Sequence, residues 1–479
     1  MKCKPAILER IYCFVFGRGA KRDPHLRSSH EMIDAFKAWG AYDSKYSGKP
    51  RILMTAGLGY GNVGDEAQCG ACIARWRRLV PDCKITIFSP NPGYTEALHH
   101  EKSEWAPRVA WFKANTGGSY FKSDDVFAKD FWKLRRRLLF TAIMIRRGIP
   151  LLWCVPREVR ILQVLQNHDV LHISGGGFLT GKTRSRLWEN CLLMRLCQIL
   201  DVPYMLTGHN IGVFQDKADR DLAYEGLRAA KYVGLRDRGI SEAELNSIGI
   251  QGPHIVSTCD DALLCPRASS EEIEALIEQL GADPQQAWVA VNFHHWGQQE
   301  SEKEKIETRF AALADHWATT YKLQVLFISM TPSDVQPNQA IVARMQTPAF
   351  LIPYSSDYRV VRGVIGDAQI CFTMKHHPIV FAQGECVPVV SVALDEYYLH
   401  KNSGAMENSG HGKYVLDKET FFSSAAEAKF AEFYAHLAKI SVEQRESLDA
   451  FKALELVPYK RILTLLFPEL VVENQEDGL

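Results

Sequence analysis

The chain has 479 residues, of which 46% are hydrophobic, and its 56 basic residues are balanced by 56 acidic ones. This length allows two or three domains with well-filled cores. Because there is no net charge to create a long-range field, we expect no nucleic-acid partner. A balanced charge suits an enzyme that acts on small molecules or carbohydrates.

Twelve cysteines are scattered along the chain, too sparsely for a disulfide scaffold. Cys69 and Cys72 form a lone C-x-x-C pair, for which packing inside a helix is the favoured interpretation. No H-E-x-x-H sequence, second C-x-x-C pair or Asp-rich loop is present, so we predict no metal site. The short apolar stretch near the start contains Glu9 and Arg10, which argues against a signal peptide. We therefore expect a protein of the reducing cytoplasm.

Strands and helices alternate along the chain from Arg51 onward. Residues 1–48 precede this pattern and are interpreted as an N-terminal extension with one or two helices. Strands are predicted at 52–55, 84–88, 170–174, 204–207 and 232–235, with helices at 65–79 and 191–200. Strands that alternate with helices predict a parallel, doubly wound sheet.

Residues 95–165 are less regular and are interpreted as a largely helical insertion. Within it, residues 131–153 are basic, aromatic and apolar at once. Two interpretations stay open for this segment. It lies on an anionic membrane surface as a peripheral contact, or it is a buried helix whose arginines flank it in solvent. No run reaches the ~18 uncharged apolar residues that a membrane span needs.

A second alternation of strands and helices follows a polar stretch at residues 265–286. Strands are predicted at 288–293, 324–329, 350–352, 369–372 and 387–392, and the tail is helical from about 425 to 466. We expect a first domain over residues 49–265 and a second over 286–479 that includes the C-terminal helices. Two such halves imply a cleft, since ligands of open α/β sheets bind outside the carboxyl ends of the strands.

The turn after the first strand is rich in glycine. Gly59-x-Gly61-x-x-Gly64 formally fits the dinucleotide-binding fingerprint. However, Asp65 and Glu66 place negative charge where a pyrophosphate would sit, and no acidic residue follows the second strand to hold a ribose. We therefore do not expect NAD.

Several segments, in order between Arg51 and Met406, form a recognisable set. They are Gly59–Ala67, Ser174–Gly177, Gly208–Gly212, Leu235–Asp237 with Ser241 and Gly249, Cys259–Ala262, and Met374–His377 with Phe381 and Ala382. Together they resemble the polysaccharide pyruvyl transferase family. The resemblance implies two Rossmann-like domains facing a cleft, as in GT-B glycosyltransferases. It also implies transfer of the enolpyruvyl group of phosphoenolpyruvate onto a sugar, with formation of a pyruvate ketal.

The resemblance also implies roles for residues that bind and activate the donor. His377 occupies the histidine position of the family motif and is implied to be the general acid, a role that suits an imidazole. Arg236, Lys375 and Lys401 are implied to bind the carboxylate and phosphate of phosphoenolpyruvate. Lys375 stands where the family has Arg, so it offers a point charge rather than a bidentate fork. Phosphoenolpyruvate is then a co-substrate, and no cofactor is expected.

The acceptor sugar is expected at the glycine-rich turns of the first domain. The residues assigned to it are Asn62, Asp65, Gly175, Gly176 and Gly177.

His294 and His295 follow the first strand of the second domain, whose end faces the cleft. Because adjacent side chains of a strand point to opposite faces, we expect no more than one of them to line it.

Three functions stay open at this point. The first is a pyruvyl transferase that acts on a sugar of a cell-surface or exopolysaccharide precursor, as a free glycan or a lipid-linked sugar. The second is a nucleotide-sugar glycosyltransferase of the same two-domain form, for which Asp395 and Glu396 offer an acidic pair for ribose. The third is a non-catalytic binding protein on the same scaffold, for which the departures from the motif at Lys375 and His376 argue.

Overall fold

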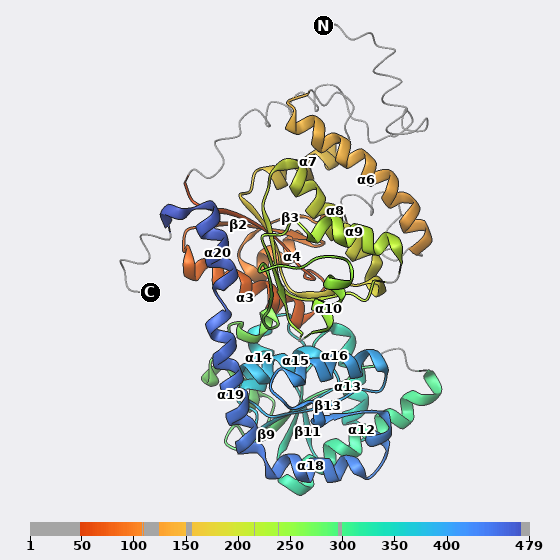
Figure 1. Ribbon diagram of the computed structural model, residues 1–479. Coiled ribbons are helices and arrows are strands. Elements are labelled where there is room, and N and C mark those ends of the chain that lie inside the picture. The colour runs from red at the N-terminus through yellow and green to blue at the C-terminus, as the bar shows by residue number, and fades with distance from the viewer. Residues whose placement is uncertain are drawn as a thin grey trace, which may run out of the picture.

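The computed structural model describes residues 48–107, 109, 124–149, 156–214, 216–237, 239–295 and 299–470. The extension predicted for residues 1–48 lies outside them, apart from its last residue. Two parallel-sheet α/β domains lie one above the other, and the chain passes from the first to the second and back (Figure 1). The predicted fold class is confirmed.

The first domain is built on an eight-stranded parallel sheet. Its order is β3–β2–β1–β4–β6–β7–β8, and β5 pairs with β6 beside this path. The strands are β1 (Arg51–Thr55), β2 (Lys84–Ser89), β3 (Lys102–Trp105), β4 (Val170–Ile173), β5 (Gly176–Leu179), β6 (Tyr204–Ile211), β7 (Tyr232–Leu235) and β8 (Ile255–Ser257). The helices are α3 (Val63–Leu79), α4 (Pro92–His99), α6 (Asp124–Arg146), α7 (Pro156–Gln166), α8 (Arg184–Leu200), α9 (Lys217–Leu227) and α10 (Ile240–Ser247). Strand order reverses between β1 and β4, and ligands of such sheets bind at this switch point.

The second domain has a six-stranded parallel sheet in the order β11–β10–β9–β12–β13–β14. The strands are β9 (Trp288–Asn292), β10 (Gln324–Phe327), β11 (Ala349–Leu351), β12 (Ile370–Thr373), β13 (Val389–Val392) and β14 (Val415–Leu416). The helices are α11 (Ser270–Gln279), α12 (Glu300–Tyr321), α13 (Val335–Val342), α14 (Tyr358–Gly366), α15 (His376–Gly384), α16 (Glu396–Glu407), α17 (Lys418–Phe422), α18 (Ala425–Ala435) and α19 (Leu437–Leu454). Helix α20 (Val457–Leu466) follows them in the chain but packs elsewhere.

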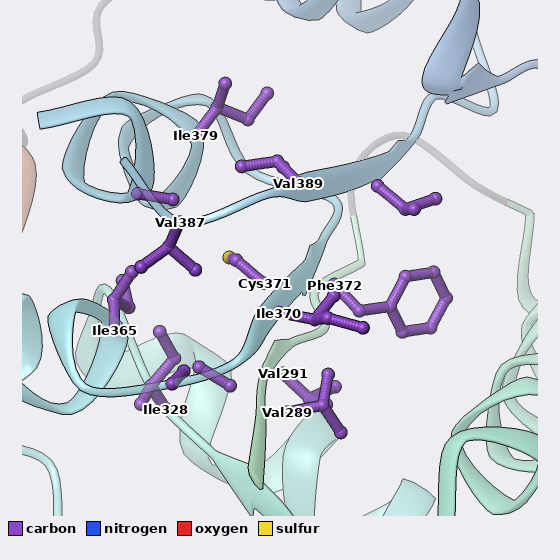
Figure 2. Close-up of a cluster of buried hydrophobic side chains, with 14 of the residues drawn as sticks. Val289, Val291, Ile328, Ile365, Ile370, Cys371, Phe372, Ile379, Val387 and Val389 are labelled. Carbon is purple, nitrogen blue, oxygen red and sulfur yellow. The ribbon is translucent and has the colours of Figure 1, made fainter. Parts of the chain in front are cut away.

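Both faces of the second sheet are covered, which explains why its strands are apolar throughout rather than alternating. In Figure 2, successive side chains of β12 point to opposite sides, with Cys371 toward Ile365 and Val387 and with Phe372 away from them. Phe372 stacks on Phe310 of α12, with ring centroids 4.7 Å apart. All five of these side chains are at most 5% exposed.

The C-terminal tail divides between the domains. Helix α19 runs beside the second domain, and α20 lies along the first (Figure 1). Tyr459, Ile462 and Leu463 of α20 share a core cluster with Trp76 of α3, whose ring centroid is 4.9 Å from that of Tyr459. This corrects our assignment of the whole tail to the second domain, because the apolar face of α20 is buried on the first.

Helix α3 lies between the two domains and is buried on nearly all sides, which explains its small residues. Cys69 and Cys72 are both buried free thiols within it. Gly64 and Gly70 allow the second domain to approach the helix backbone. A Cβ on Gly64 would lie 2.0 Å from Nδ1 of His377, and one on Gly70 would lie 2.1 Å from the hydroxyl of Tyr358.

We therefore expect Gly70→Ala to destabilise the protein, although alanine favours helices. The added methyl group collides with Tyr358, and overpacking of this kind costs about 1–3 kcal/mol. Urea unfolding measures the change. Gly93→Ala in α4 is the matched control, since no atom lies within 4 Å of its added Cβ. Equal free energies of unfolding for Gly70→Ala and Gly93→Ala would contradict the close contact between the domains at Gly70.

Candidate active site

A cavity of about 750 Å³ lies between the domains, at the carboxyl ends of both sheets. Its lining is drawn from both halves of the chain. The polar residues among its walls include Lys182, Asn210, Arg236, His376, Tyr397 and Lys401, and Gly177 contributes backbone. The cavity therefore lies where the topology predicts a ligand.

Arg236 follows β7 and is 4% exposed. Its guanidinium forms an ion pair with the buried carboxylate of Asp260 and donates to the side-chain oxygen of Asn210. Asp260 also accepts from Gln68 Nε2 at 2.9 Å and from the backbone N–H of Ala262 at 2.9 Å. Burial by itself would raise the pKa of Asp260, but Arg236 holds it well below its usual range. Asp260 is therefore a fixed anion that orients Arg236.

Two adjacent histidines begin helix α15. His376 is 6% exposed, and its Nε2 lies 3.5 Å from Oδ2 of Asp260. His377 packs on Gly64 in the first turn of α3, so the N-termini of α3 and α15 meet here. Burial lowers the pKa of His376 to about 3 and that of His377 well below its usual range, and Arg236 adds to both effects. Both imidazoles are therefore neutral while the site is empty, and the helix ends favour an anion.

Lys401 of α16 faces Arg236 across the domain boundary. Burial, with a smaller contribution from the neighbouring Arg236, lowers its pKa to about 8 even though Asp65 and Asp260 act in the opposite direction. Burial raises the pKa of Asp65 to about 6, against the opposing effect of Arg186 and Lys401. Two cations thus share one partly desolvated space and can bind a small dianion.

Tyr397 lies between two lysines from different domains. The Nζ of Lys182 is 4.7 Å from its ring centroid, and the Nζ of Lys401 is 5.7 Å from it. Such cation–π contacts position both ammonium groups at the cavity.

Of the predicted residues, Arg236, Lys401 and Gly177 line this cavity, whereas His377 and Asp65 lie beside it within electrostatic reach of Arg236 and Lys401. A built Cβ on Gly177 would lie 3.2 Å from Nη2 of Arg236. The assignment of these residues to donor and acceptor stays a prediction.

Other predicted residues are engaged elsewhere. Lys375 forms an ion pair with Asp334 at 2.7 Å. Asn62 accepts from the N–H of Gly64 as the N-cap of α3. Gly175 donates its N–H to Asp261 at 2.8 Å, and Gly176 is buried as the first residue of β5.

The two histidines after β9 diverge. His294 lies against the ring of Tyr398, with centroids 5.1 Å apart, and near Lys375. His295 pairs with Glu307 of α12 at 2.8 Å. Neither is part of the cavity wall described above.

Sequence reasoning did not assign a role to Asp260, His376 or Lys182. Asp260 lies in a segment that carried the resemblance, so its position was a usable signal. His376 was noted only as a departure from the motif, and nothing in the sequence marks Lys182. Within the described part of the chain, no three His, Cys, Asp or Glu side chains are grouped so as to hold a metal ion.

Residues 62–396 match the family described as polysaccharide pyruvyl transferase, and the chain belongs to that family. No curated protein matches it in sequence.

Solved structures with a similar fold include three proteins of low sequence identity. One is a glycosyltransferase from Rickettsia africae ESF-5, with 13% identity and a TM-score of 0.50, covering 87% of this chain and 98% of that one. Another is UDP-GlcNAc 2-epimerase from Neisseria meningitidis bound to UDP-GlcNAc, with 11% identity and a TM-score of 0.52, covering 86% and 100%. The third is Alr3699/HepE from Anabaena in complex with UDP, with 14% identity and a TM-score of 0.50, covering 87% and 100%. These likenesses show the GT-B fold.

Asp260→Asn tests the buried ion pair. Loss of the carboxylate leaves Arg236 buried without its counter-charge, and we expect a loss of about 3 kcal/mol in the free energy of unfolding near neutral pH. Because the native pKa of Asp260 is depressed, its contribution is present above the unfolded value of about 3.9 and fades as the pH falls below it. Urea unfolding of wild type and of Asp260→Asn at several pH values measures the difference between their free energies of unfolding. We expect this difference to shrink as the pH falls.

The control for this experiment is Asp82→Asn, which removes an exposed carboxylate paired with Lys49. We expect no measurable change there. The role of Asp260 would be contradicted if both variants lost a similar free energy of unfolding. It would also be contradicted if the difference between Asp260→Asn and wild type did not depend on pH.

Proposed function

We propose that this protein transfers a pyruvyl group from phosphoenolpyruvate to a sugar and forms a pyruvate ketal. One observation carries the proposal. Arg236 of the first domain and Lys401 of the second line one interdomain cavity, and His377 lies beside it, close enough for both cations to lower its pKa, next to two helix N-termini. Membership of the family supports the same reaction.

In the proposed reaction, Arg236 and Lys401 bind the carboxylate and phosphate of the donor. A proton from His377 adds to C3, and C2 becomes an oxocarbenium-like electrophile. A sugar hydroxyl attacks C2 and loses its proton to the imidazole or solvent. The bond from C2 to the phosphate oxygen then breaks, inorganic phosphate leaves, and a second hydroxyl of the same sugar closes the ketal with loss of its proton.

The neutral state of His377 in the empty site fits this sequence of events. Arg236 and Lys401 disfavour an imidazolium there, whereas a bound dianion would offset both cations and raise the histidine pKa. The acid would therefore gain its proton when the donor binds.

The acceptor in this proposal is a sugar of a cell-surface or exopolysaccharide precursor, as a glycan or a lipid-linked sugar. Three exposed aliphatic side chains, Val213, Ile240 and Leu399, stand at the cavity wall and suit an acceptor with an apolar portion. We place the reaction in the cytoplasm, which is supported by the nine described cysteines, all of them free.

The second candidate is a nucleotide-sugar glycosyltransferase, favoured by solved structures of this fold that hold UDP or UDP-GlcNAc. Of the acidic pair expected to hold ribose, Glu396 lines the cavity. Asp395 instead accepts from the N–H of Tyr398 as the N-cap of α16. Calorimetric titration with phosphoenolpyruvate and with UDP-sugars separates the two candidates. Binding of a UDP-sugar alone would favour the glycosyltransferase, and binding without turnover of any acceptor would favour the non-catalytic protein.

Donor affinity should fall as the pH rises through about 8. Lys401 loses its proton there, and the site loses one of its two cations. Lys401→Arg should hold its affinity to higher pH, because a guanidinium stays charged, and Lys401→Met should bind weakly at every pH. Calorimetric measurement of the dissociation constant for phosphoenolpyruvate between about pH 6 and about pH 10 tests this pH dependence. The range runs from about the usual histidine pKa to about the usual lysine pKa. Lys439→Met, an exposed lysine on α19, is the control.

Binding of phosphoenolpyruvate near neutral pH should also take up protons. Calorimetric titrations in two buffers of different ionisation enthalpy measure directly the number of protons taken up on binding. We expect His377→Asn to reduce the uptake and to lower turnover about 100-fold or more while it still binds the donor. His376→Leu, which introduces the residue of the family motif, should retain turnover if His377 is the acid. Unchanged turnover of His377→Asn would refute this assignment.

A further inference from the structure

Helix α6 presents two opposite faces, and only one of them is packed. Phe131, Leu134, Leu138, Ala142 and Ile145 are at most 7% exposed and belong to the core of the first domain. Phe131 lies against Trp188 of α8, with ring centroids 4.9 Å apart. The buried-helix interpretation of residues 131–153 therefore holds for this face from Phe131 to Ile145, and residues 150–153 lie outside those that the structure describes.

The opposite face carries exposed aromatic, aliphatic and basic side chains, of which Trp132 also contacts Trp188 of α8, with ring centroids 5.6 Å apart. Its members, which we call the α6 outer face, are Trp132, Lys133, Arg136, Ile143, Arg147 and Ile149. Trp132, Arg136 and Ile143 fall within about 40° of one another at ~100° per residue. Trp132, Ile143 and Ile149 are 38%, 40% and 42% exposed. Trp132, Arg136 and Ile143 therefore form one stripe along the helix, and Arg147 and Ile149 are exposed just beyond its end at Arg146.

The charge on this stripe is of one sign. No acidic residue occurs between Phe131 and Ile149. Three other arginines of the segment, Arg135, Arg137 and Arg146, have carboxylate partners in Glu225, Glu158 and Asp201. Lys133, Arg136 and Arg147 form no ion pair with any residue that the structure describes.

We propose that the α6 outer face docks on an anionic lipid bilayer. Exposed basic side chains attract anionic headgroups, while a tryptophan and isoleucines among them enter the boundary between headgroups and acyl chains. The helix lies along the surface in this arrangement. None of the helices in the described part of the chain has the length and apolarity of a membrane span. This docking is independent of the reaction proposed above.

Sedimentation of the full chain with vesicles tests the proposal. Wild type should pellet with phosphatidylcholine vesicles that contain phosphatidylglycerol and much less with phosphatidylcholine alone. The triple variant Lys133→Glu, Arg136→Glu, Arg147→Glu should lose at least about 100-fold in partitioning, because removal of three cations costs about 1 kcal/mol each and the added carboxylates are repelled by anionic headgroups. Its matched control is Lys305→Glu, Lys439→Glu, Lys452→Glu, which makes the same change in net charge on exposed residues of the second domain and should pellet as wild type does.

A second variant, Ile143→Ser with Ile149→Ser, separates insertion from attraction by charge. This variant should bind the anionic vesicles at low salt concentration. It should be released from them at a higher salt concentration at which wild type stays bound. Equal pelleting of the charge-reversed variant and wild type, or equal loss in the control, would overturn the proposal. A dimer would also overturn the proposal, if sedimentation velocity without vesicles detects it in wild type, the α6 substitutions dissociate it, and neither wild type nor any variant binds vesicles. That result would assign the α6 outer face to contact with a second copy of the chain. Donor binding in solution should be the same in all these variants, so failure here leaves the proposed function untouched.

Discussion

The buried carboxylate of Asp260 is the interaction on which the arrangement of the site depends. It accepts from Gln68 of α3, pairs with Arg236 after β7 and faces His376 at the start of α15. A charge removed from water in this way is tolerated only when its partners are in place. The first domain supplies Asp260, Gln68 and Arg236, and the second domain adds His376 to the same electrostatic unit.

Helix α3 makes that unit possible by bringing the domains into direct contact. Its glycines remove side chains where the second domain approaches, so that His377 rests on Gly64. The backbone N–H of Val63 donates to the carbonyl of Met330 at 2.9 Å, which continues the contact in the first turn. Two helix N-termini thus face one small space, and their dipoles add to the positive potential of the nearby cations. This geometry explains why the site favours a compact anion over a neutral ligand.

Much of the fold was predictable because buried parallel strands read as apolar runs between helices. Four of the described strands escaped prediction. Lys102–Trp105 forms β3 at the edge of the sheet with polar residues, and Gly176–Leu179 forms β5 from residues interpreted as a loop. The strands β8 and β14 are largely apolar, but with three and two residues they are too short to stand out as apolar runs. The return of α20 to the first domain also escaped, because a helix's apolar face does not specify which surface it covers.

The site was predictable to the extent that each residue lies in an ordered motif. Arg236, His377 and Lys401 were found in this way and do converge. The partners that decide their charge were not predictable. Asp334 neutralises Lys375 from 41 residues away in sequence, and Asp260 orients Arg236 through a contact that only the fold creates.

The neutralisation of Lys375 has a consequence for how the donor would be held. With that lysine paired to Asp334, the cations at the cavity wall are Lys401 on the second domain and, on the first, Lys182 and Arg236, the last of which is also paired with Asp260. A dianion bound to both Lys401 and Arg236 bridges the domains, so its binding energy also favours the closed arrangement. Tyr397 lies between Lys401 and Lys182 of the first domain and extends this bridge to the edge of the cavity. In the proposed reaction, a donor bound to both cations would therefore help to hold the two domains together around the reacting atoms.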